Sequence, residues 1–213
     1  MTAEEIARHF TRSDGTYLCA RWGRPIVPVV FGVEADTLRV VKGAIEAVVA
    51  LCGHRMAETD AELGANLMMF FCRDWAELPQ VPNLDRMIPD LPALCARLET
   101  VGANQYRGFR YDPAGAIRAA FVFLRMDAHL AAAPAEDLAL AQVAQVMLSW
   151  SEAAFAEVSP LAGVGAHVVL RPDVAGLLRA AYDPVLPAVA RDASHALRLF
   201  ARVVAARRQG WSR

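Results

Sequence analysis

The stretch QYRGFRYDPAGAIRAAFVFLRMD (Gln105–Asp127) contains two runs of β-forming residues on either side of a short turn. β-Branched and aromatic residues recur in both runs, as is typical of strands. In the turn DPAG, Asp112 suits the first position and Gly115 relaxes the last one. The stretch therefore predicts a β-hairpin.

Two further strands are expected upstream of this hairpin. The run PIVPVVFGV (Pro25–Val33) is rich in β-branched residues and ends near Gly32, and Pro28 favours an edge position or a bulge because proline cannot donate to a ladder. The run NLMMFFCR (Asn66–Arg73) is almost entirely apolar, which is typical of a strand covered on both faces. We expect this second strand to lie centrally in the sheet.

Helical spacing of apolar residues marks most of the remaining chain. Leu38, Val41 and Ile45 recur at helical spacing, and Gly53 supplies a stop. Four prolines between Trp75 and Pro92 exclude a long helix there. About five helices are expected, at residues 35–53, 91–101, 134–155, 171–182 and 192–208, the third being the longest.

These elements predict one α+β domain over residues 1–213. It has a sheet of about four strands, mostly antiparallel, packed with about five helices. Residues 1–20 form an N-terminal arm, and residues 188–213 form a C-terminal basic helix.

Charge and hydropathy exclude several function classes. The formal net charge of −1 provides no overall field to attract nucleic acid. The arginines after Arg191 fit the dipole at the end of a C-terminal helix, with a polyanion site as the alternative. No apolar stretch approaches the ~18 residues that span a bilayer. The opening MTAEEIARHF is not a signal peptide, so the protein is expected in the cytoplasm as written, or in the envelope if an export signal was removed.

The four cysteines show neither a C-x-x-C pair nor zinc-finger spacing to a histidine. We expect reduced, buried thiols, because most of the cysteines lie in apolar segments where cysteine behaves as a small hydrophobe. A bridge from Cys19 to Cys72, or from Cys52 to Cys95, is the alternative and would imply an exported form.

The segment AQVAQVMLSW (Ala141–Trp150) lies where a zinc peptidase would carry H-E-x-x-H on a helix. Ala141 and Gln145 fall at the two metal-ligand positions, and Gln142 falls at the general-base position. Alanine has no donor atom, and a glutamine amide is a poor zinc ligand and no base. The polar residues of this segment form a stripe of Gln142, Gln145, Ser149 and Glu152. We interpret this stripe as a solvated helix face, with the floor of a ligand groove as the alternative.

Other chemistry has weaker support. No phosphate-binding loop or nucleophile elbow is present, and GVG at Gly163–Gly165 is too short and follows a helix. His129 and His167 with an acid form one conceivable metal site. In LRMDAH, alternation would place Arg125, Asp127 and His129 on one face if the strand continued, giving a polar site, whereas a simple exit from the strand is the other reading.

Three segments carry a resemblance to a known family. RWGRPIVPVVFG (Arg21–Gly32), a hairpin leading into a Q-x-x-Q helix, and RPDVAGLLRAAYDPVLP (Arg171–Pro187) resemble a bacterial domain-of-unknown-function family of predicted lipoproteins. That family is itself similar to degenerate zincins, whose metal motif is lost. The resemblance implies a zincin-like fold in which the hairpin forms the sheet edge over a groove and the Ala141 helix lines that groove.

Three functions are expected from these observations. The first is a non-catalytic domain that binds a peptide or a small polar ligand in the groove, without metal or cofactor. The second is a hydrolase with a rearranged site at His129, Asp127 and Glu152, and the third is a homodimeric assembly component. The candidate ligand groove comprises Gln142, Gln145, Ser149, Glu152, Arg125, Asp127 and His129.

Overall fold

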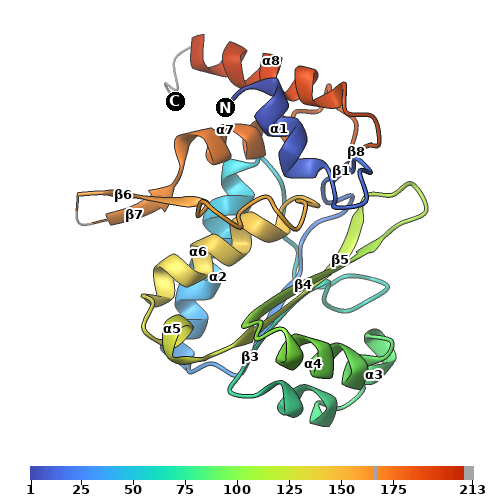
Figure 1. Ribbon diagram of the computed structural model, residues 1–213, viewed down its shortest axis with the longest axis vertical. Coiled ribbons are helices and arrows are strands. Elements are labelled where there is room, and N and C mark those ends of the chain that lie inside the picture. Colours follow the sequence, from blue (N-terminus) through green and yellow to red (C-terminus); the bar gives the residue numbers. More distant parts are fainter. Residues whose placement is uncertain (166, 209–213) are drawn as a thin grey trace.

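The central element of the protein is a mixed four-stranded sheet. The computed structural model describes residues 1–165 and 167–208 (Figure 1). The strand order is β2-β3-β5-β4, in which β2 pairs with β3 and β3 with β5 in parallel, while β4 and β5 pair antiparallel. The bounds are β2 Pro28–Phe31, β3 Leu67–Cys72, β4 Gln105–Tyr111 and β5 Ile117–Arg125.

The prediction of a mostly antiparallel sheet is therefore wrong for this four-stranded sheet. Helix α2 (Ala35–Leu51) crosses from β2 to β3, and such a crossover makes the two strands parallel. After β3 the chain lays β4 at the far edge and returns through the hairpin to place β5 parallel to β3. The hairpin, the edge position of β2 and the central position of β3 are confirmed.

Helices cover both faces of the sheet (Figure 1). The larger core contains residues of α2, α6, α7 and α8, and a second core lies under η1, α3 and α4. Nine helices occur in the described residues, because short ones join the expected set. The bounds of these helices are η1 Trp75–Gln80, α3 Leu84–Met87, α4 Leu91–Thr100, α5 Ala128–Ala131, α6 Ala135–Val146, α7 Pro172–Ala181 and α8 His195–Arg208.

Helix α6 is shorter than predicted, and the longest helix in the described part of the chain is α2 with 17 residues. The chain leaves the helix after Val146 because neighbouring side chains take its last carbonyl groups. The indole Nε1 of Trp22 donates to the carbonyl of Val146 at 2.8 Å, and the hydroxyl of Tyr182 donates to that of Met147 at 2.8 Å. Ser149 then pairs with the backbone of Ala20, so Ser149 and the residues after it are not helical.

The N-terminal segment packs against the described part of the C-terminal segment. Within the predicted N-terminal arm, α1 (Ala3–Phe10) buries Ile6 and Phe10, and β1 (Cys19–Ala20) pairs antiparallel with β8 (Val189–Ala190). In the predicted C-terminal basic helix, residues 188–194 are not helical, α8 begins at His195, and residues 209–213 lie outside the described residues.

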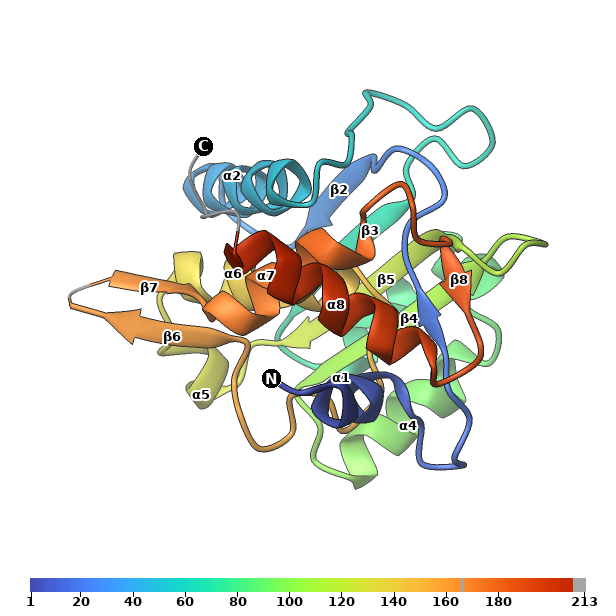
Figure 2. The same ribbon diagram turned by 90° about the horizontal axis from the view of Figure 1, so that it is seen from above.

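A hairpin that the sequence did not predict projects from the body of the molecule. Strands β6 (Leu161–Val164) and β7 (His167–Leu170) pair antiparallel and extend away from the helices, as two views show (Figures 1 and 2). The GVG motif is thus part of this hairpin. Each strand of this hairpin has only four residues, which is too few for the sequence pattern alone to predict a strand.

All four cysteines are free and buried, as predicted. Cys19 and Cys52 belong to the larger core and Cys72 and Cys95 to the second one, so the alternative bridge between Cys19 and Cys72 would have to cross the sheet. None of the helices in residues 1–165 and 167–208 combines the length and hydropathy that a bilayer-spanning helix requires.

Candidate functional site

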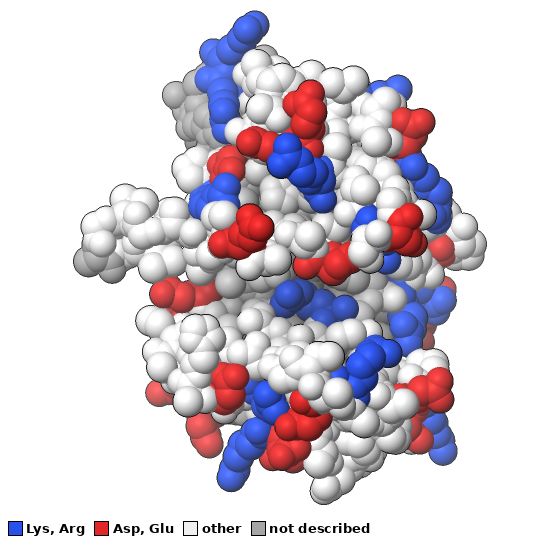
Figure 3. Space-filling model, viewed as in Figure 1, with Lys and Arg blue, Asp and Glu red and all other residues white. Residues whose placement is uncertain are grey.

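A groove runs between strand β4 on one side and α6 with the segment 150–161 on the other. Two adjoining cavities of about 450 and 550 Å³ share five lining residues and so form one continuous depression. The space-filling view shows a hollow across this face with basic side chains on its floor (Figure 3). The shared residues are Gln105, Arg107, Gln145, Phe155 and Ala156.

The β4 wall of the groove is an open sheet edge. The N–H of Arg125 donates to the carbonyl of Asn104 at 2.9 Å, which makes these two residues a hydrogen-bonded pair between β5 and the start of β4. Such pairs alternate along an antiparallel ladder. The backbone groups of Gln105, Arg107 and Phe109 therefore point away from β5, and within the described residues β4 has no strand partner on that side.

Three polar side chains form a connected cluster at the centre of the groove. Nη1 of Arg107 donates to Oε1 of Gln142 at 2.7 Å and to Oε1 of Gln105 at 3.3 Å. Nε2 of Gln142 donates to Oε1 of Gln105 at 2.7 Å. Burial lowers the pKa of Arg107 to about 10, although the group stays charged at neutral pH.

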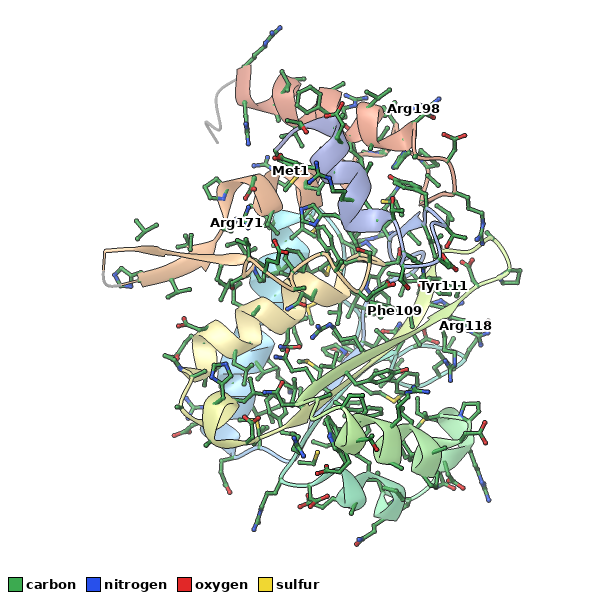
Figure 4. The ribbon with its side chains drawn as sticks, viewed as in Figure 1. Met1, Phe109, Tyr111, Arg118, Arg171 and Arg198 are labelled. Carbon is green, nitrogen blue, oxygen red and sulfur yellow. The ribbon has the colours of Figure 1, made fainter. Side chains whose placement is uncertain are left out.

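Aromatic side chains line one end of the groove. Phe109, Trp150 and Phe155 lie there together, with Trp150 and Phe155 packed edge to face at 4.9 Å between ring centroids. Figure 4 shows Phe109 and Tyr111 at the part of β4 nearest the hairpin turn, where both pack against the larger core. This end combines apolar surface with a charged neighbour, Arg12.

Four of the seven predicted groove residues line these cavities, namely Gln142, Gln145, Glu152 and His129. The interpretation of the polar stripe as a solvated helix face is wrong for two of its members, since Gln142 and Ser149 are each only 1% exposed. The helix turns Gln142 toward β4, where the two polar side chains on that strand compensate its burial. Nε2 of Gln145 donates to the carbonyl of Ala141 at 3.1 Å.

The other three predicted residues serve local structure. The hydroxyl of Ser149 accepts from the N–H of Ala20 at 2.8 Å and donates to the carbonyl of Leu18 at 3.1 Å. Arg125 pairs with Glu99 at 2.7 Å.

Asp127 caps α5 by accepting from the N–H of Leu130 at 2.9 Å, and that hydrogen bond is the main cause of its lowered pKa. Strand β5 ends at Arg125, so the alternation assumed for Arg125, Asp127 and His129 does not apply.

Glu152 accepts from the N–H of Ser13 at 2.6 Å, and hydrogen bonds from Ser13 lower the pKa of its carboxyl. Within the described residues no hydrogen bond or ion pair joins Glu152 to Asp127 or His129. Glu152 therefore has surroundings different from those of Asp127 and His129, whereas His129 contributes to the lowered pKa of Asp127.

Sequence reasoning missed Gln105 and Arg107. Strand alternation places Gln105, Arg107 and Phe109 on one face of β4, and this signal was present in the QYRGF run. The side chains became informative only once α6 was known to lie over that face. Pattern within one strand does not show which helix covers it.

Among residues 1–165 and 167–208, no group of three or more histidine, cysteine, aspartate and glutamate side chains is placed to hold a metal ion. The conceivable site of His129 and His167 with an acid is therefore not formed there. No family model matches the chain, and no curated protein or solved structure matches it either.

Proposed function

We propose that the protein is a non-catalytic binding domain, zincin-like in fold, that holds an extended peptide segment in the groove between β4 and α6. The observation that carries this proposal is the open edge of β4, where Gln105, Arg107 and Phe109 line the groove and their backbone groups have no partner strand in the described residues. An extended peptide can add to such an edge through main-chain hydrogen bonds.

The opposite wall supports the same function. Gln145 and Ala156 face the β4 edge along both halves of the groove, and aromatic side chains provide apolar contacts at one end. Main-chain pairing supplies affinity, while alternate side chains of the peptide would enter the pockets on either side. The antiparallel edge strand beside a helix supports the zincin-like proposal, and the amides of Gln142 and Gln145 support binding rather than proton transfer.

A tryptophan at position 156 is expected to block peptide binding. Ala156 is exposed and lines both halves of the groove, so a large side chain there fills the space without disturbing the core. Retention of a pool of N-acetylated random hexapeptides on the immobilised protein, measured by mass spectrometry, should fall by about tenfold or more in Ala156→Trp. A pool with N-methylated backbone amides should be retained as poorly by the wild type.

The matched control is Ala153→Trp, which adds the same side chain at an exposed position of the same segment that does not line the groove. It should bind like the wild type. Equal retention by Ala156→Trp and Ala153→Trp would contradict the assignment of the groove.

A second candidate, a homodimer, is favoured by the projecting β6–β7 hairpin. Residues 158–170 contain no Asp, Glu, Lys or Arg, and Val164, Val168 and Val169 are exposed by 60%, 37% and 37%. A two-stranded ribbon with both faces in water is marginally stable. Identical uncharged ribbons do not repel one another, so a second copy is a suitable cover.

The double substitution Val164→Lys and Val169→Lys tests this candidate. Antiparallel register places both valines on one face of the ribbon, and two positive charges on that face should repel the partner copy. Light scattering should show a wild-type dimer and a dissociation constant raised by about tenfold or more in the variant. A wild type that stays monomeric at high concentration would remove the dimer from consideration.

A further inference from the structure

Arg107 is a desolvated cation whose described partners are all neutral. Its two hydrogen bonds go to the amide oxygens of Gln105 and Gln142. Several other arginines form ion pairs with carboxylates. Among the described residues, none of the ion pairs includes Arg107. A buried charge is costly unless a counter-charge compensates it. Among the described residues, the charge of Arg107 in the groove is therefore balanced by no ion pair.

One edge of this guanidinium is free to bind. Both hydrogen bonds use Nη1, so the N–H groups on Nε and Nη2 have no partner in the part of the chain that is described. These two groups point in the same direction and match the two oxygens of a carboxylate. Arg107 is partly exposed and lines both halves of the groove, so a ligand there can reach this edge.

The glutamines hold the guanidinium in place for such a ligand. Oε1 of Gln142 accepts from Nη1 of Arg107 at 2.7 Å, and Nε2 of Gln142 donates to Oε1 of Gln105 at 2.7 Å. Each amide is therefore itself oriented by a hydrogen bond. Because amides carry no charge, they fix the geometry without neutralising the cation. A site held in place before binding loses less entropy when the ligand arrives.

The charges around the groove favour an anion with one negative charge. Hydrogen bonds from Ser13 and attraction to Arg12 lower the pKa of Glu152, and Arg12 and Glu152 line the same half of the groove. Asp137 and Glu157 line the other half of the groove. A phosphate dianion would carry a surplus negative charge toward these acids, whereas a carboxylate is balanced by Arg107 alone.

We propose that Arg107 binds a carboxylate group, through its Nε–H and Nη2–H, and that the ligand of the groove is a monoanionic carboxylate. This inference rests on the proposed function for the groove being a ligand site. It adds the chemical class of the ligand, which backbone pairing with β4 does not specify.

Acetate is the simplest probe of this subsite. In a ¹H–¹⁵N NMR titration, the Nε–H signal of Arg107, assigned by its loss in Arg107→Lys, should shift with acetate and saturate at a half-point on the order of 10 mM. Sodium chloride at the same ionic strength should give no saturable shift. A response that does not saturate, or that chloride reproduces, would overturn the proposal.

The variant Gln142→Glu provides a second test that keeps the shape of the groove. The new carboxylate would lie where Oε1 of Gln142 now accepts from Arg107, so it would supply the missing counter-charge. Acetate affinity should fall by about tenfold or more, because the new carboxylate already balances the charge of the guanidinium. Unchanged acetate binding in Gln142→Glu would also overturn the proposal, even if Arg107→Lys folds poorly.

The source of the carboxylate is distinguished by two further probes. Stronger retention of hexapeptides with a free carboxyl terminus than of the same pool amidated would assign the group to a peptide terminus. Saturable binding of benzoate without retention of either pool would assign it to a small organic acid, and would end the peptide proposal while leaving the carboxylate subsite intact. Peptide retention that Ala156→Trp abolishes, without a saturable acetate response, would end the carboxylate proposal while leaving peptide binding in the groove intact.

Discussion

Gly32→Ala is expected to lower the free energy of unfolding by more than about 3 kcal/mol. Gly32 follows β2 with φ at +80°, a conformation that residues with a Cβ rarely adopt. A Cβ at this position would lie 1.9 Å from the carbonyl oxygen of Phe71 on the neighbouring strand. Neither the oxygen nor the backbone that carries it can move without disturbing the pairing of β2 with β3. Urea unfolding followed by circular dichroism measures the loss.

Gly43→Ala is the matched control with the opposite sign. Gly43 lies within α2, is exposed, and has nothing within 4 Å of an added Cβ. Alanine there should stabilise the protein by about 0.5–1 kcal/mol because it has the higher helix propensity. If both variants changed the free energy of unfolding by the same small amount, the result would contradict the close contact between Gly32 and the carbonyl oxygen of Phe71.

Local pattern predicted the elements better than their arrangement. The helical spacing of Leu38, Val41 and Ile45 predicted α2, and the apolar run from Asn66 predicted a central strand, because both signals lie within one segment. The direction of a strand depends on the path of the chain outside it. A hairpin is antiparallel by itself, yet its second strand lies parallel to β3, which the hairpin sequence does not encode.

The candidate site was predictable in part for the same reason. Gln142 and Gln145 were identified from the helix pattern, and both line the groove. The end of α6 was not predicted, because it depends on Trp22 and Tyr182, which are far from it in sequence. Arg107 was missed since its significance comes from having amides rather than acids as neighbours, and neighbours across elements are set by tertiary packing.

Asn66→Ala is expected to destabilise the protein by about 3 kcal/mol, because buried polar groups lose their partners. Asn66 is 0% exposed, and its Oδ1 accepts from the N–H of Val27 at 2.8 Å. Its Nδ2 donates to the carbonyl of Pro25 at 2.9 Å and to Oδ2 of Asp60 at 3.0 Å. The side chain thereby fixes the segment before β2 to the start of β3, and alanine would leave the N–H of Val27 without its side-chain acceptor.

The control is Asn104→Ala, which removes a single partly buried hydrogen bond from Nδ2 of Asn104 to Asp127. It should cost about 1 kcal/mol. Chemical unfolding of the two variants beside the wild type compares the losses. Equal losses would show that the partners of Asn66 contribute no more than one ordinary hydrogen bond.

The pH dependence of Asn66→Ala provides an independent check through Asp60. Burial alone would raise the pKa of Asp60, but hydrogen bonds from the N–H groups of Glu62 and Leu63, and from Asn66 and Arg24, outweigh it and hold the pKa at about 2. A carboxyl whose folded pKa lies below its ordinary value of 3.8 stabilises the fold above that value and loses this contribution as pH falls toward about 2. Removing Asn66 raises the pKa of Asp60, so the variant has less of this contribution to lose. The difference in unfolding free energy between wild type and variant should therefore narrow as pH falls from neutral toward the pKa of Asp60. A difference that stays constant over that range would mean that Asn66 stabilises the protein only through Val27 and Pro25.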